Sequence, residues 1–163
     1  MPAQNRIART VAPLQSLPPF LRARAQSILF RRMVPFTGTA RLLFEEVTEE
    51  RVSISIRNRR RVQNHIKGVH AAATALVGET ATGFVVGMNL PDDKLPLLRR
   101  MSIDYTRRSK GDIRATATLT EEQRAAIVSE PKGEVTVPVT VTDDSGEAPV
   151  TCEFVWAWIP KKR

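Results

Sequence analysis

The chain has 163 residues, enough for one domain with a substantial core and too few for two comfortable ones. Its single cysteine, Cys152, excludes an intramolecular disulfide and a cysteine metal cluster, and Glu79 interrupts the one apolar run that approaches the roughly 18 residues of a membrane span. The net charge is +8, but residues 1–41 contain seven arginines and no acidic residue, so the basic character belongs to the amino-terminal arm.

This basic arm, residues 1–37, is expected to be irregular up to Pro18 and then to form one helix. In residues 19–33 apolar side chains recur at helical spacing, with arginines on the other face, which predicts a short amphipathic helix. Such an arm could meet phosphate-bearing ligands, anionic membranes or nucleic acid, or could simply be a solvated surface. The nearly neutral remainder and the few aromatic residues argue against nucleic acid, and we expect no stable membrane insertion.

Residues 38–163 are predicted to form a single α+β domain with about five to six antiparallel strands and one long helix. Strands are expected at 40–47 and 51–58 before the helix, and at 99–108, 112–120, 134–142 and 148–159 after it, with a short helix at 121–128. Pro138 lacks an N–H for the sheet, so the strand that contains it is expected to lie at an edge or to carry a bulge.

The long helix, over residues 70–89, is apolar on nearly all sides apart from Glu79. A helix of this kind is buried, here between the sheet and a second subunit. Gly78, Gly83 and Gly87 each lower helix propensity by up to about 1 kcal/mol, so we expect close packing to explain them. A buried carboxylate destabilises a fold unless it is paired or changes its pKa, so Glu79 is predicted to serve a structural pair or chemistry.

Nine residues separate His70 from Glu79, a rise of about 13 Å that also leaves the two side chains on opposite sides of the helix. They cannot converge easily within one chain. Two such helices packed antiparallel about a two-fold axis would bring the start of one towards the middle of the other. Any site that combines His70 and Glu79 therefore belongs to a homodimer.

The spacing of an asparagine, a histidine six residues later and an acid nine residues after that resembles the hotdog-fold acyl-CoA thioesterases of the phenylacetate-pathway (PaaI-like) type. The matching residues are Asn64, Gly68, His70 and Glu79. Ala71 and Ala72 stand where that family usually has two glycines, and residues 101–112 resemble its strand and loop after the helix. The resemblance covers roughly residues 38–160 and implies a hotdog fold, a long central helix wrapped by an antiparallel sheet.

The resemblance implies a thioesterase site shared between two chains. Glu79 would be the general base, or else the nucleophile, acting on a thioester bound by the other chain. There the backbone N–H of Ala71 would polarise the thioester carbonyl with help from the helix dipole, while Asn64 would orient the water or the carbonyl. His70 would hold the loop or donate a hydrogen bond, and Gly68 and Ala72 would line the substrate site.

Coenzyme A, or else an acyl-carrier protein, is implied as the carrier of the acyl group, and no cofactor and no metal are expected. Arg107, Arg108 and Lys110 would pair with the phosphates of coenzyme A, with the arginines at 59–61 as weaker candidates. We expect a homodimer, with a dimer of dimers left open. The amino terminus lacks a signal-peptide pattern, so the expected location is cytoplasmic.

Each of these roles has a structural alternative. His70 could only cap the helix, Asn64 could only make a turn, and the basic residues at 107, 108 and 110 could be a solvated strand end. Tyr105, Trp156 and Trp158 are expected to pack rather than to bind substrate. For the whole protein, the alternative is a non-catalytic hotdog module that binds an acyl ligand or serves as a scaffold.

Overall fold

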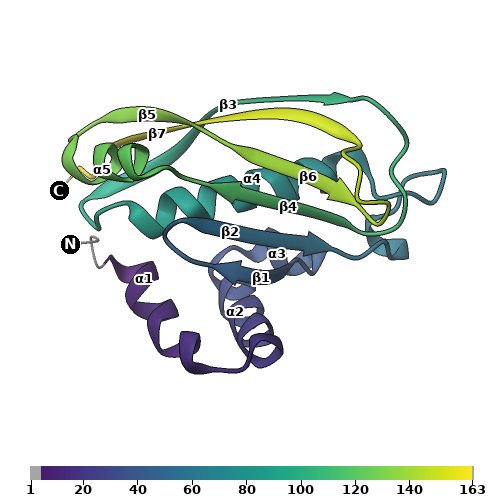
Figure 1. Cartoon of the computed structure of the whole chain (residues 1–163), viewed down its shortest axis with the longest axis horizontal. Helices are drawn as coiled ribbons and strands as arrows, with labels where there is room; N and C mark the ends of the chain where they lie inside the picture. Colours follow the sequence, from purple (N-terminus) through teal and green to yellow (C-terminus); the bar gives the residue numbers. More distant parts are fainter. Residues whose placement is uncertain (1–4, 163) are drawn as a thin grey trace.

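The computed structural model describes residues 5–162, with the long helix α4 (Ala71–Asn89) at its centre. Antiparallel strands wrap around this helix, and Figure 1 shows the amino-terminal helices α1 (Arg6–Val11) and α2 (Pro19–Met33) below the first two strands. The strands are β1 (Leu43–Val47), β2 (Arg51–Ile56), β3 (Lys94–Tyr105), β4 (Ile113–Thr118), β5 (Gly133–Val137), β6 (Val139–Asp143) and β7 (Val150–Pro160). The short helix α5 (Glu121–Ser129) follows β4, as expected. The hotdog prediction is confirmed.

Pro138 marks the joint between two sheets, whose strand orders are β1-β2-β4-β6 and β3-β7-β5. Proline has no N–H to donate, and the expected single strand at 134–142 is divided there. The part before Pro138 pairs with β7, while the part after it pairs with β4. The residues described therefore form seven strands where about five to six were predicted. The expected edge position is confirmed, because β5 ends one sheet and β6 ends the other.

Strand β3 begins at Lys94, five residues before the strand that we expected at 99–108. The buried Lys94 Nζ donates hydrogen bonds to the carbonyl oxygens of Ile127, Val128 and Glu130, at 2.9, 2.9 and 2.6 Å. The last carbonyls of a helix have no partner within it, and a lysine satisfies them well. Lys94 thus fastens the start of β3 to the end of α5, a contact between distant segments that no local pattern reveals.

Two aromatic rings of β7 lie against α4 at its glycines. A Cβ on Gly78 would lie 2.8 Å from the Phe154 ring, and a Cβ on Gly83 would lie 2.7 Å from the Trp156 ring. A larger residue would clash at both positions, so the prediction that close packing explains these glycines is confirmed there. By length and composition α4 could span a membrane, but more than half of it is buried inside the fold, as expected for a core helix.

The amino-terminal arm contains more helix than predicted. Besides α2 (Pro19–Met33), the structure has α1 (Arg6–Val11), a 3-10 turn at 12–16 and α3 (Pro35–Ala40), so the expectation of a single helix is wrong. Asn5 is the reason for α1: its Oδ1 accepts from the Ala8 N–H at 2.8 Å, and its Nδ2 donates to two carbonyls at the end of α4. One capping residue is a weak signal in a sequence that otherwise reads as irregular.

Helix α2 packs on β1 and joins the arm to the core. Phe30 of α2 is fully buried and contacts the rings of Phe44 and Phe84, with centroids 4.9 and 4.6 Å away. Ser27 Oγ also accepts from the backbone N–H of Phe44 at 2.8 Å. The arm is thus continuous with the hotdog core through a strand and through α4.

Candidate functional site

The loop before α4 is organised by Asn64. Its Oδ1 accepts from the backbone N–H groups of Ile66 and Gly68, at 3.1 and 3.0 Å, and its own N–H donates to the Gly68 carbonyl at 2.9 Å. Asn64 therefore makes a turn, which is the structural role considered for it from the sequence. No hydrogen bond within residues 5–162 uses its Nδ2, so this donor remains available to a ligand.

His70 is the residue that caps α4. Its Nδ1 accepts from the Ala72 N–H at 3.0 Å, so a neutral ring carries its proton on Nε2. This bond occupies the Ala72 N–H. The N–H of Ala71, at the first helical position, has no acceptor in the helix and none elsewhere among the described residues. Ala71 therefore presents a free donor at the positive end of the helix dipole.

A cavity of about 120 Å³ lies beside this free donor. The lining residues that the sequence analysis named are Asn64, Gly68, Ala71, Arg107 and Arg108. Tyr105 forms another wall and donates its hydroxyl to the Ala71 carbonyl at 2.7 Å. The structure thus brings together the predicted oxyanion donor, the predicted orienting amide and two of the three predicted basic residues.

The side chains of Arg107 and Arg108 are already engaged within the chain. Arg107 Nη1 donates to Asp143 Oδ2 at 2.8 Å, and Arg108 Nη2 donates to the Ile66 carbonyl at 2.8 Å. Lys110 does not line the cavity, and its backbone N–H donates to Asp143 Oδ2 at 2.7 Å. The Arg107 guanidinium and the other donors hold the pKa of the buried Asp143 carboxyl well below its usual range. A phosphate would compete with Asp143 for Arg107.

We expect Asp143→Asn to destabilise the domain by about 2 kcal/mol near neutral pH, because a charged acceptor of several hydrogen bonds is lost. The folded-state pKa of Asp143 lies below its unfolded-state pKa, so its ionised form contributes stability above the unfolded value, roughly 3.9, and loses it as the pH falls through the folded value. Urea unfolding of both proteins at pH 7 and pH 3 measures this. The stability difference should shrink at pH 3; an unchanged difference contradicts the role given to the carboxylate.

Glu79 lies in a different cavity, of about 230 Å³, whose walls are mostly apolar. The lining residues are Ile7, Met33, Val34, Glu79, Thr80, Gly83, Phe84, Gly87, Pro96 and Trp156. Burial raises the pKa of the Glu79 carboxyl above its ordinary value, and the Thr80 hydroxyl, 3.4 Å from Oε2, opposes part of this rise. Among the described residues, none that lines this cavity is basic. A carboxylate in such surroundings can act as a base closer to neutral pH.

Three residues of this cavity come from the arm, which was expected to lie outside the hotdog domain. Ile7 lies on α1, while Met33 and Val34 lie at the end of α2. Trp156, expected only to pack, also forms a wall. The one available signal was the presence of apolar residues in an otherwise basic segment, and it does not say what they contact.

The predicted catalytic residues, together with Ala72 of the predicted substrate site, are thus distributed over three cavities of one chain. Asn64 and Ala71 line the first, His70 and Ala72 line a second of about 210 Å³, and Glu79 lines the third. The nine residues from His70 to Glu79 span about 13 Å along α4. One chain therefore presents the two halves of the predicted site without joining them.

Comparison with known proteins supports the fold. The family model for a domain of unknown function, DUF4442, matches residues 22–159. No curated protein matches the sequence. A Pseudomonas aeruginosa protein of unknown function, called a "probable thioesterase", is 22% identical, with 89% of this chain and 97% of that chain covered and a TM-score of 0.73.

Two further solved structures carry the same fold. A variant of a thioesterase enzyme from Staphylococcus aureus is 16% identical, with coverage of 78% of this chain and 100% of that chain and a TM-score of 0.64. A thioesterase from Haemophilus influenzae is 10% identical, with coverage of 77% and 82% and a TM-score of 0.62. At such identities the similarity shows the fold that these proteins share.

Proposed function

The chain belongs to the DUF4442 family, and from this premise and its hotdog fold we propose that it hydrolyses acyl thioesters, with coenzyme A as the expected carrier. The observation that carries the proposal is Glu79, a half-buried carboxylate without a basic partner in an apolar cavity. The same helix offers the free N–H of Ala71 at its start. A base and an oxyanion donor are the two groups that thioester hydrolysis requires.

In the proposed reaction Glu79 takes a proton from a water molecule that attacks the thioester carbonyl. The Ala71 N–H of the partner subunit binds the oxygen as it becomes negatively charged, and the dipole of α4 adds to this stabilisation. The free Nδ2 of Asn64 orients the water or the carbonyl. Collapse of the tetrahedral intermediate breaks the C–S bond and leaves the carboxylic acid, and the proton held by Glu79 passes to the departing thiolate, which restores the base.

The apolar cavity beside Glu79 supports a hydrocarbon acyl group as the part of the substrate that is recognised. Ligand pockets are typically lined by apolar and aromatic side chains with a few polar groups, and here the carboxyl of Glu79 is the charged group among apolar walls. Met33 and Val34 close the cavity from the arm, and Trp156 closes it from β7. The arm therefore belongs to the proposed acyl site.

The free edge of β3 supports the homodimer. This strand ends the order β3-β7-β5, so one row of its backbone groups has no partner strand among the described residues. Met101 pairs with Phe154 and Tyr105 with Val150, which places them on the sheet face that carries the buried side chains of β7. Yet Met101 is 46% and Tyr105 50% exposed. A second copy packed along β3 would cover them.

One observation favours the non-catalytic alternative. Asn64 makes a turn and His70 caps α4, and neither of these structural roles requires catalysis. Under this alternative, the chain binds an acyl ligand in the Glu79 cavity without turning it over. Acyl thioester that is bound and stays intact would distinguish this function from hydrolysis.

A hydrolysis screen tests the proposal. Purified protein is incubated with short-chain, long-chain and aromatic acyl-CoAs, and the released thiol is measured against a baseline of protein alone, which corrects for the free Cys152. We expect turnover of at least one acyl-CoA, with a preference for apolar acyl groups. Absence of turnover for every acyl-CoA, in protein that is folded and dimeric, contradicts the proposal.

A further inference from the structure

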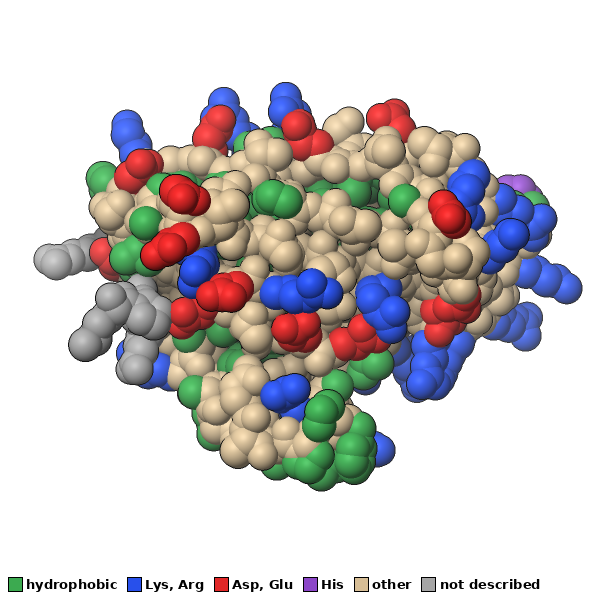
Figure 2. Space-filling model, in the orientation of Figure 1, with side chains coloured by type: hydrophobic (Ala, Val, Ile, Leu, Met, Phe, Trp, Pro, Cys, Tyr) green, Lys and Arg blue, Asp and Glu red, His purple; other side chains and the backbone are tan. Residues whose placement is uncertain are grey.

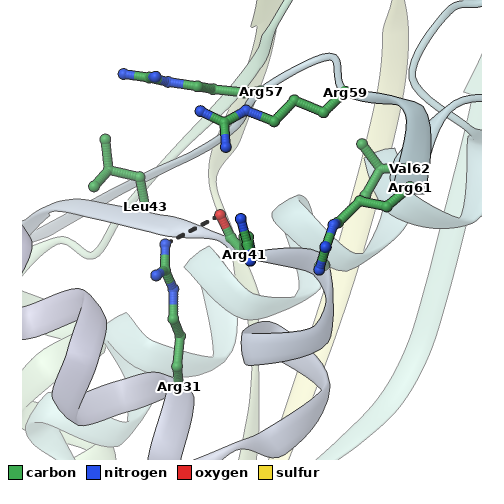
Figure 3. A pocket seen from close by; sticks show the side chains of 8 residues that line it. Arg31, Arg41, Leu43, Arg57, Arg59, Arg61 and Val62 are labelled. Carbon is green, nitrogen blue, oxygen red and sulfur yellow. Dashed lines mark hydrogen bonds between the residues drawn. The ribbon is translucent and has the colours of Figure 1, made fainter.

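Five arginines surround one cavity of about 250 Å³ that the proposed reaction does not use (Figure 3). They are Arg31 of α2, Arg41 at the end of α3, and Arg57, Arg59 and Arg61 from the segment after β2. Figure 3 shows the guanidinium group of Arg31 on one side of this space and those of Arg57 and Arg59 on the other. Segments far apart in the sequence thus contribute positive charge to one place.

Within residues 5–162 none of these five arginines forms an ion pair with a carboxylate, although Arg57 also lines a neighbouring cavity that contains Glu45, Asp112 and Asp144. The arginine cavity itself has no acidic lining residue among those described. The pKa of Arg31 is lowered, first by burial and then by the charge of Arg41 beside it. Figure 2 shows basic side chains crowded at the end of the molecule where β2 ends. Like charges held together cost free energy that a bound anion would recover.

The cavity is held in place by the fold. Arg31 Nε donates to the Leu42 carbonyl at 2.8 Å, and its Nη2 donates to the Arg41 carbonyl at 3.2 Å. Arg41 has φ of 56°, in the left-handed region that residues other than glycine rarely occupy, where it ends α3. Arg31 thus braces an unusual turn and keeps its remaining guanidinium nitrogen, Nη1, for a ligand.

We propose that this cavity binds a ligand that carries closely spaced phosphate groups. A planar guanidinium matches two oxygens of a phosphate, and five of them exceed what one carboxylate or one isolated phosphate requires. The cavity shares Ala40, Arg61 and Val62 with the one that contains His70, so a phosphate bound here lies next to the start of α4. The phosphates could belong to a nucleotide-type thioester carrier or to a lipid headgroup. Binding itself does not rest on thioester hydrolysis.

Titration of the full chain with inorganic pyrophosphate in a calorimeter, at low salt, tests the proposal. We expect binding that weakens at least tenfold in Arg59→Gln. The matched control is Arg60→Gln, which removes the same charge from the next residue; Arg60 is exposed and does not line the cavity. Arg31 is left intact because it holds the turn at Arg41. Undetectable pyrophosphate binding, or equal weakening in both variants, overturns the proposal.

Two further binding experiments identify which kind of ligand supplies the phosphates. One measures binding of coenzyme A, and the other measures association with phosphatidylcholine vesicles that contain phosphatidic acid. We expect one of the two to bind with the same dependence on Arg59 and the same indifference to Arg60; binding by neither counts against the site. Since pyrophosphate binding needs no turnover, failure of this proposal and failure of hydrolysis are separate results.

Discussion

Glu79→Gln is expected to lower kcat for acyl-thioester hydrolysis by at least roughly a hundredfold, the lower bound for removing a general base. Glutamine has nearly the shape of glutamate and can still accept from the Thr80 hydroxyl, 3.4 Å away in the wild type. It cannot take a proton from water. The measurement is the steady-state rate of thiol release with the best acyl-CoA of the screen. The control is Glu121→Gln, which removes an exposed carboxylate from the start of α5 and should keep the wild-type rate.

The free energy of unfolding of Glu79→Gln, measured as a function of pH, is a second readout that a merely inactive protein would not change. Burial raises the folded-state pKa of Glu79 above its unfolded value, so the carboxyl favours folding while it is protonated and loses this contribution as the pH rises through the folded pKa. Glutamine mimics the protonated form at every pH. Glu79→Gln should therefore be more stable than the wild type at pH 7 and nearly equal to it below the unfolded pKa, roughly 4.3.

Two outcomes would count against this reading of Glu79. An unchanged rate in Glu79→Gln removes the carboxylate from catalysis. A variant less stable than the wild type at pH 7, with the dimer intact, means that Glu79 has a stabilising charge partner across the interface. The second outcome supports the non-catalytic alternative, in which the acid serves a structural pair.

Much of the fold could be predicted because its signals are local. The alternation of Val52, Ile54 and Ile56 with polar residues predicts a strand, and all three are buried in β2. Ser53 and Ser55 on the other face are buried as well, which the alternation did not predict. The apolar run around Glu79 likewise predicts a buried helix, and in the structure this run forms α4, most of whose second half is buried. The start of β3 could not be predicted in this way, because Lys94 is fixed by carbonyl groups of α5, more than thirty residues away.

The candidate site was predictable only as residue types at fixed spacing. The separation of His70 and Glu79 on one helix already implies two half-sites, and the structure places them in different cavities. Spacing could not reveal that Met33 and Val34 close the Glu79 cavity, or that Arg31 and Arg41 join the arginines after β2. These contacts depend on how α2 packs against β1, which is a tertiary property without a sequence period.

Ala71→Pro should remove the proposed oxyanion donor and leave the helix in place. Proline lacks an N–H and is well tolerated at the first position of a helix, where the residue before it must be extended. His70 already has φ of −62° and ψ of 144°, and the Ala71 side chain is exposed. Loss of one oxyanion donor lowers kcat by roughly 10²–10³-fold. Ala71→Gly, which keeps the N–H, is the control and should remain active.

Mixing the two inactive variants tests whether the site is shared. Glu79→Gln and Ala71→Pro subunits are unfolded together and refolded in equal amounts, so that half of the dimers are mixed. In each mixed dimer, one of the two sites combines an intact Glu79 from one chain with an intact Ala71 N–H from the other. The activity should therefore return to about a quarter of the wild-type value if the interface is two-fold symmetric. A site within one chain gives no recovery, because each subunit then lacks one of the two groups. Recovery thus requires that the start of one α4 helix meets the middle of the other.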